Sequence, residues 1–237
     1  MKLFLFVIFN MSVVSSCLSQ TMNSTLTDQS GSQVWVTRPV STADMFPDEV
    51  FQKRIANKED GSKYLYESWE QPVRIIFTNN KELRLQLINF NLKDNQFETE
   101  SLGDTLFIFN NETIKKVETF NSSFVKLFNP KTGEDGFFQP LLVSDKLNFY
   151  KLPELHISKG VLNPLTQERS PDVLTKSVSY FYSKGNFNLQ QVKLKKKHIL
   201  NILSNKKKEI ITYVETHKFD YSSEVDVVKI LAFYNSL

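Results

Sequence analysis

The segment Val73–Phe90, VRIIFTNNKELRLQLINF, decides the fold. Its first half is rich in β-branched and apolar residues, and Asn79-Asn80 supplies the chemistry of a turn. In its second half Leu83, Leu85 and Leu87 alternate with polar residues, which is the period of a strand with one buried face. The segment therefore predicts an antiparallel β-hairpin.

Strand-like runs continue on the C-terminal side of this hairpin at spacings of roughly 8–12 residues, which is typical of an antiparallel meander. We expect four further strands at Gln96–Glu100, Leu106–Phe109, Ile114–Phe120 and Phe124–Phe128. Two more hairpins are expected, one joining Phe138–Ser144 to Leu147–Leu152 and one joining Ser177–Ser183 to Phe187–Leu194. Gly160–Thr175, with two prolines, is predicted to be a loop.

The pattern changes near both ends of this region. On the N-terminal side we expect a strand at Val34–Thr37 and a short helix at Asp48–Asn57. After residue 195 apolar residues recur at helical spacing. Asn205 is the expected cap of one helix, and Ser222 or Ser223 that of the last.

These patterns predict an α+β chain. Its body is a mainly antiparallel curved sheet, sandwich or open barrel, with two or three C-terminal α-helices. We expect a signal peptide over 1–19, a flexible tether over 20–33, a β-rich domain over 34–194 and a helical subdomain packed on the sheet over 195–237. The 20 phenylalanines in 237 residues fit a large β core.

The N-terminal segment predicts export. Lys2 is followed by a short, mostly apolar run from Leu3 to Val14 and by the small residues Ser15 and Ser16, as in a signal peptide. The run is shorter than the roughly 20 apolar residues that a membrane-spanning helix needs. We expect a location in the periplasm, at the outer membrane or outside the cell.

Two interpretations of the cleavage site stay open. Val14-Ser15-Ser16-Cys17 resembles the lipobox of bacterial lipoproteins, in which the cysteine becomes the lipidated first residue. Alternatively, cleavage occurs near Ser19 and removes Cys17, the only cysteine of the chain. A disulfide within the body is excluded in both cases. Membrane attachment is expected only through such an anchor.

Positive charge gathers at the C-terminal end. The chain carries a net charge of +3, and from residue 190 onward nine lysines face five acidic residues. The candidate contacts to an anionic surface are Lys195, Lys196, Lys197, Lys206, Lys207 and Lys208. The alternative is that these lysines form a solvated helix surface. Nucleic acid is not an expected partner because the protein is predicted to be exported.

No motif of a common enzyme class occurs in the sequence. His156, His198 and His217 lack the short spacing of metal ligands, and neither a phosphate-binding loop nor a hydrolase signature is present. We therefore expect no cofactor and name no catalytic residue. Aromatic residues around Tyr64–Trp69 and Tyr180–Tyr182 are candidates for lining a ligand groove, or else for the core.

Several segments resemble a family of uncharacterised exported proteins of flavobacteria-type bacteria. These segments are Tyr66–Trp69, Phe149–Leu152, Ser179–Tyr182, Asn205–Ile210 and Ala232–Asn235. The resemblance implies an exported, β-rich protein without an assigned activity, and it supplies no functional residue. The favoured hypothesis is a non-catalytic envelope module that binds an envelope protein or an apolar ligand, or that assists assembly. The alternative is an envelope-glycan hydrolase with an unrecognised carboxylate pair.

Overall fold

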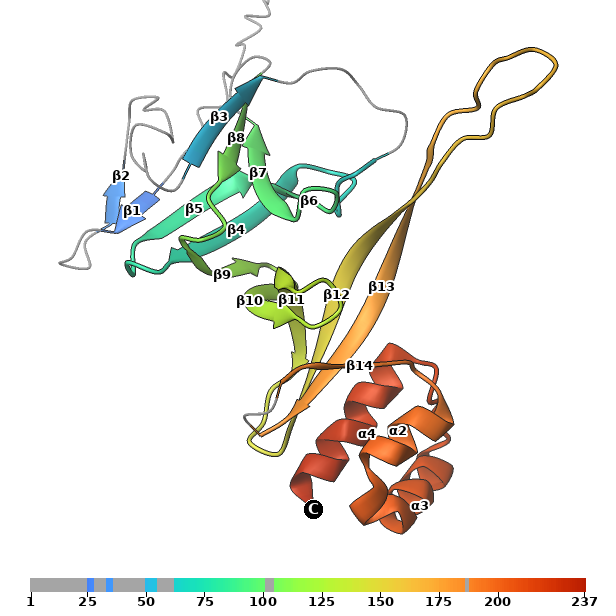
Figure 1. Ribbon diagram of the computed structural model, residues 1–237. Helices are drawn as coiled ribbons and strands as arrows, with labels where there is room; N and C mark the ends of the chain where they lie inside the picture. Colours follow the sequence, from blue (N-terminus) through green and yellow to red (C-terminus); the bar gives the residue numbers. More distant parts are fainter. Residues whose placement is uncertain (1–24, 28–32, 36–49, 55–61, 101–104, 186–187) are drawn as a thin grey trace, which may run out of the picture.

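The described residues form two antiparallel sheets followed by three helices near the C-terminus, which confirms the predicted α+β class (Figure 1). The computed structural model describes residues 25–27, 33–35, 50–54, 62–100, 105–185 and 188–237. Ten strands make the large sheet in the order β14-β13-β12-β11-β10-β9-β4-β5-β1-β2, and four make the small sheet in the order β3-β8-β7-β6. The bounds of the first eight strands are β1 Thr25–Thr27, β2 Gln33–Trp35, β3 Val50–Arg54, β4 Glu70–Phe77, β5 Glu82–Leu87, β6 Asn89–Asn91, β7 Gln96–Glu100 and β8 Thr105–Phe109. The others are β9 Ile114–Thr119, β10 Ser123–Asn129, β11 Glu134–Leu142, β12 Leu147–Ser158, β13 Val173–Lys184 and β14 Gln190–Val192.

The predicted central hairpin is present as β4 and β5, paired in the register Ile75↔Leu83. Asn80 in its turn has a φ of 62°, a left-handed conformation that asparagine tolerates. The inward residues of this hairpin pack against the small sheet in a core dominated by phenylalanine. Phe97 is 1% exposed, and its ring centroid lies 4.7–5.3 Å from those of three other buried phenylalanines.

Two predictions at the N-terminal side differ from the structure. Residues 50–54 form strand β3, paired with β8, so the short helix expected over Asp48–Asn57 is wrong within that range. Backbone pairing to a neighbouring strand overrides the local pattern there. Strand β1 lies inside the segment predicted as a tether (20–33) and pairs with β5 and β2. The β body therefore begins before residue 34.

The C-terminal helices pack on one end of the large sheet (Figure 1). They are α2 Lys196–Ile202, α3 Lys207–His217 and α4 Glu224–Ser236, with a 3₁₀ turn at Ser204–Lys206. Leu147 and Phe149 of β12, both fully buried, share their core with the apolar faces of these helices. No helix among the described residues is long and apolar enough to cross a membrane.

The helix caps were predicted in part. Ser223 caps α4, since its hydroxyl accepts a hydrogen bond from the Asp226 amide at 3.3 Å. Asn205 does not cap α3, which begins at Lys207 after Lys206 as its N-cap. The amide oxygen of Asn205 instead accepts a hydrogen bond from the Tyr234 hydroxyl at 3.2 Å, which ties the 3₁₀ turn to α4.

Strands β12 and β13 form a long hairpin that the sequence did not predict. All twelve residues of β12 pair with β13, from Leu147↔Lys184 to Ser158↔Val173. Among the described strands, β11 and β14 flank only the proximal part of this hairpin. The distal part extends away from the body as a two-stranded projection (Figure 1). We refer to residues 152–179 as the arm.

Candidate interaction surface

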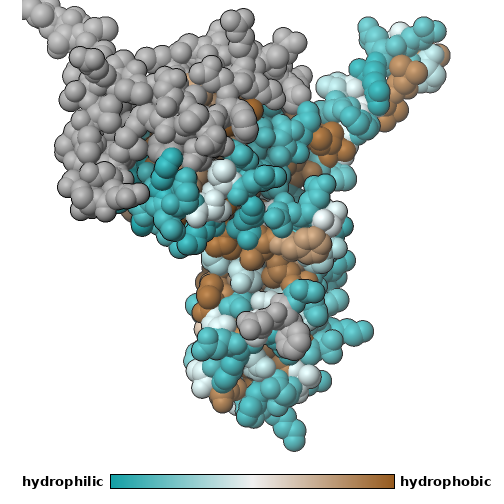
Figure 2. Space-filling model, turned by 60° about the vertical axis from the view of Figure 1, so that its left-hand side comes forward, coloured by the Kyte–Doolittle hydropathy of each residue, from teal (hydrophilic) through white to brown (hydrophobic). Residues whose placement is uncertain are grey.

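The arm has one apolar and one polar face. Cross-strand partners share a face, and successive residues of a strand alternate between faces. The apolar face carries Pro153, Leu155, Ile157, Leu174 and Val178, together with Lys176. The opposite face carries Glu154, His156, Ser158, Val173, Thr175, Ser177 and Ser179. Figure 2 shows hydrophobic residues along one side of the arm and at its base.

The tip of the arm is a folded loop. The amide of Gly160 donates to the Asp172 carboxylate at 2.8 Å, and Arg169 Nε donates to the Gly160 carbonyl at 2.9 Å. A Cβ on Gly160 would lie 1.7 Å from the Ser170 carbonyl oxygen, so this close approach of two chains requires glycine. The Lys159 ammonium, 2.8 Å from Asp172, lowers the pKa of that carboxyl.

The folded tip holds apolar side chains in solvent. Leu165 is 93% exposed, Val161 75% and Leu162 58%. Hydrogen bonds of the loop fix the backbone that carries them, such as the one from the Gln167 amide to the Asn163 carbonyl at 2.9 Å. Three large apolar side chains exposed within five residues of an ordered loop make the tip the candidate for a protein contact.

A groove of about 340 Å³ lies where the arm meets the body. It is lined by Leu65, Tyr66, Leu92, Gln139, Lys151, Pro153, Lys176, Ser177 and Val178. Lys176 Nζ donates to the Leu65 carbonyl at 3.4 Å across the groove. Burial raises the pKa of the Tyr66 hydroxyl, against a smaller opposing effect of the Ser122 and Thr119 hydroxyls. The groove thus continues the apolar face of the arm into the body.

A charged cluster fixes helix α4 to the root of the arm. The carboxylate of Glu224, the first residue of α4, lies 3.0 Å from Lys151 Nζ. The same carboxylate accepts a hydrogen bond from the Tyr180 hydroxyl at 2.8 Å. Burial, and then the bond to Glu224, raise the pKa of Tyr180. The negative charge also lies at the helix N-terminus, where the helix dipole favours it. The arm and the helices are therefore locked together at this point.

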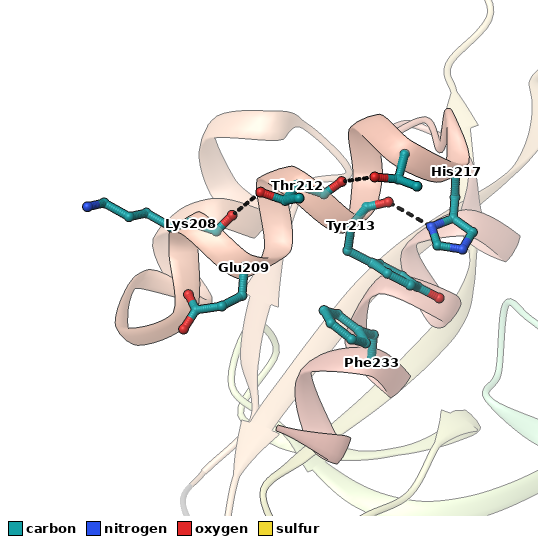
Figure 3. Close-up of a pocket in the computed structure, with 7 residues that line it drawn as sticks. Lys208, Glu209, Thr212, Tyr213, His217 and Phe233 are labelled. Carbon is teal, nitrogen blue, oxygen red and sulfur yellow. Dashed lines mark hydrogen bonds between the residues drawn. The ribbon is translucent and has the colours of Figure 1, made fainter.

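A second hollow, of about 510 Å³, lies between α3 and α4 (Figure 3). It is lined by Lys208, Glu209, Thr212, Tyr213, Thr216, His217 and Phe233. Tyr213 stacks on Phe233 with ring centroids 3.9 Å apart. Thr212, Thr216 and His217 bond to carbonyls one turn back in α3. Because these polar groups are engaged within their own helix, we assign the hollow to helix packing.

The predicted basic residues lie around two helix starts. Lys195, Lys196 and Lys197 are exposed at the beginning of α2, and Lys207 and Lys208 are exposed at that of α3. Lys206, the N-cap of α3, is partly buried and lies 3.5 Å from the Glu209 carboxylate. A positive charge at a helix N-terminus opposes the helix dipole. Contact of these lysines with an anionic surface stays a prediction.

Two carboxylates meet at Asn91: Asp94 is exposed, whereas Glu98 is buried in the body. Asn91 Nδ2 donates to both Asp94 and Glu98, at 2.9 and 2.7 Å. Glu98 is 1% exposed and also accepts hydrogen bonds from the Tyr64 hydroxyl and from Gln96, each at 2.8 Å. Burial, and then Glu98, raise the pKa of Tyr64. Glu98 fastens Tyr64 to the small sheet through this hydrogen bond. Because a glycan cannot reach the buried Glu98, the two carboxylates lend no support to glycan hydrolysis.

The remaining candidate residues lie apart from one another. His156 is on the polar face of the arm, His198 is in α2 and His217 ends α3. Among the described residues no group of three or more His, Cys, Asp or Glu side chains could hold a metal ion. Cys17 lies outside the described residues.

Of the predicted aromatic candidates, Tyr66 lines the groove, whereas Tyr64 packs edge-on against Trp69 at 4.8 Å. Tyr180 serves the helix contact, and Phe181 is fully buried on the opposite face of the sheet. In the sequence, Leu155 and Ile157 alternate with polar residues, and Leu174 lies in the strand that pairs with them. This alternation was the signal that could have indicated the arm.

Comparisons with known proteins give no relative. No family model, no curated protein and no solved structure matches this chain.

Proposed function

We propose that this chain is an exported protein of the bacterial cell envelope that works as a non-catalytic binding or assembly module, and that the arm is its contact element. The observation that carries the proposal is the folded tip, which presents Leu165, Val161 and Leu162 to solvent at the end of a projecting hairpin. Exposing these side chains in an ordered loop is costly unless a partner covers them.

The partner favoured by this surface is a protein. The arm is narrow and two-stranded, so it offers a projecting ridge rather than an enclosed cavity for a small apolar molecule. The N-terminal segment supports export, and Cys17 provides the position for a lipid anchor if cleavage precedes it. A soluble or lipid-anchored module with a protruding apolar ridge suits contact with another envelope component.

The test compares the native size of the protein in gently solubilised envelopes with that of a tip variant. Leu162→Ser with Leu165→Ser removes the apolar tip and leaves both cores intact. Phe120→Ser is the matched control, because Phe120 is 89% exposed but lies outside the arm, next to the β9–β10 turn. We expect the wild type and the control in a larger assembly and the tip variant as a free chain. A wild type that migrates as a free chain would contradict the proposal.

Export is tested separately by the intact mass of the mature protein. A chain that begins at Cys17 with an acyl adduct identifies a lipoprotein, and a chain that begins near Gln20 identifies a soluble exported protein. A mass that includes Met1 or Lys2 would contradict export.

A further inference from the structure

Two prolines set the hydrogen-bonding phase of the arm. Proline has no amide hydrogen, so in an antiparallel ladder it fits only a position where the amide points away from the paired strand. Pro140 of β11 pairs with Tyr150, and Pro153 of β12 pairs with Val178. The nitrogen of Pro140 must therefore point away from β12, and the nitrogen of Pro153 must point away from β13. Both requirements are met when the amides of the even-numbered residues of β12 point toward β13. By the same register, the amides and carbonyls of Leu174, Lys176 and Val178 in β13 point outward.

The two outer edges of the arm differ in what they offer. On β12, Pro153 occupies the first outward position beyond β11 and removes its donor, so that edge offers outward amides only farther out, at Leu155 and Ile157. On β13, strand β14 covers only Tyr180–Tyr182. Beyond it, no described residue pairs with the outward groups of Leu174, Lys176 and Val178. We refer to the outward side of residues 174–178 as the open edge. It continues the side of β13 along which β14 pairs with Tyr180–Tyr182.

We propose that an extended segment of another envelope polypeptide adds as a strand to this open edge, in line with β14. The inference rests on the proposed binding function and names the mode of binding and the kind of partner. Three outward amides and carbonyls, at alternate residues about 7 Å apart, match the backbone of an extended polypeptide. Addition of a strand to an exposed sheet edge is an established mode of peptide recognition.

The side chains beside the edge define the partner further. One face of the added strand would lie along the apolar face of the arm and above the groove beside Val178 and Leu65. Apolar residues at alternate positions of the partner fit that surface. Lys176, whose ammonium also donates to the Leu65 carbonyl at 3.4 Å, is the charged residue of this face, so an acidic residue of the partner fits beside it.

The charge of Lys176 argues against a second copy of this chain as the occupant. If two copies paired through all three outward residues of the open edge, the two-fold axis would pass beside Lys176, the middle one of the three. The two ammonium groups would then lie directly opposite each other, and like charges in that position are destabilising.

The experiment separates backbone pairing from side-chain contact in the full-length protein within its own envelope. A photo-crosslinking amino acid at position 178 reports the neighbour, and mass spectrometry maps the adduct. Lys176→Pro removes one outward amide and leaves the bonds to β12 intact, as Pro153 does on the other edge. Lys176→Thr is the control, because it removes the charge and keeps the amide.

We expect adducts on one short segment of a single polypeptide. Lys176→Pro should lower the adduct yield by at least about tenfold, because a hydrogen bond is lost and its acceptor is left unpaired. Lys176→Thr should lower it by no more than about fivefold, the range of an exposed ion pair. Leu174→Pro repeats the test farther from the core if Lys176→Pro lowers the thermal stability of the protein.

Several outcomes would overturn the inference. An adduct that survives both proline variants excludes strand addition, and an adduct on lipid, on glycan or on a second copy excludes the stated partner. If the assembly is lost in the Leu162→Ser and Leu165→Ser variant but not in the proline variants, the proposed function stands and this inference fails. If neither set of variants affects the assembly, both fail.

Discussion

Replacing Tyr180 by phenylalanine isolates the contact that locks the helices to the root of the arm. The substitution keeps the ring, which stacks on Phe149 with centroids 5.7 Å apart and planes at 7°. It removes only the hydroxyl that donates to the Glu224 carboxylate at 2.8 Å. The loss therefore measures one hydrogen bond to a charged acceptor.

A hydrogen bond of this kind contributes about 1.5–3 kcal/mol to the free energy of unfolding. The side chain of Glu224 is 28% exposed, so water replaces part of the lost bond. We therefore expect a loss near the lower end, of about 1.5–2 kcal/mol, for Tyr180→Phe. For a domain of this size that corresponds to a fall in Tm of about 3–8 °C. Tyr182→Phe, which removes an exposed bond to Gln190, should cost less than about 1 kcal/mol.

The same variant has a signature in alkali. The pKa of Tyr180 is raised in the folded protein, so its contribution to stability is complete below the ordinary tyrosine pKa of about 10. The contribution is lost as the pH rises above that value. Denaturant titrations between pH 7 and 11 should show a steeper loss of stability for the wild type than for Tyr180→Phe. Equal unfolding free energies at pH 7, or superimposable pH curves, would refute the assignment of this contact.

Three further predictions concern the rest of the fold. Phe97→Ala should lower the unfolding free energy by about 3–5 kcal/mol in denaturant titrations, because Phe97 is buried against three other rings, and a loss under about 1 kcal/mol would contradict that core. Ser223→Ala should cost about 1 kcal/mol through the lost cap of α4, whereas Ser223→Asp should restore it, both measured by thermal unfolding. Arg74 lowers the pKa of Glu82, so that contribution to stability is present above about pH 4.5 and is lost as the pH falls below it. Arg74→Met should therefore reduce the loss of unfolding free energy at acidic pH, by less than about 1 kcal/mol in denaturant titrations. An unchanged pH dependence would exclude the Arg74–Glu82 pair as a cause of that loss.

The sequence predicted the elements whose determinants are local. The β4–β5 hairpin follows from alternating leucines and an Asn-Asn turn, and α4 follows from its serine cap and helical spacing. The arm was missed because pairing between distant residues determines its length. Pro153 interrupts the first strand, and the prolines of 160–175 favour a loop. Residues 173–176 become a strand only because 155–158 lie beside them.

The candidate surface was hidden for the same reason. The exposure of Leu165 and the outward direction of the Lys176 amide both follow from the register of β12 and β13, which spacing along the chain does not reveal. The strand β3 shows the opposite error, since a local pattern suggested a helix where pairing with β8 imposes an extended backbone.

Residue-resolved amide hydrogen exchange of the free, full-length protein tests the central claim most directly. If the arm is an ordered hairpin with an open β13 edge, protection must alternate along that strand. The account predicts slow exchange at Thr175 and Ser177 and fast exchange at Leu174, Lys176 and Val178. Uniformly fast exchange would show that the arm is not an ordered hairpin. Uniform protection would show that the open edge is already paired, and either result would contradict the account.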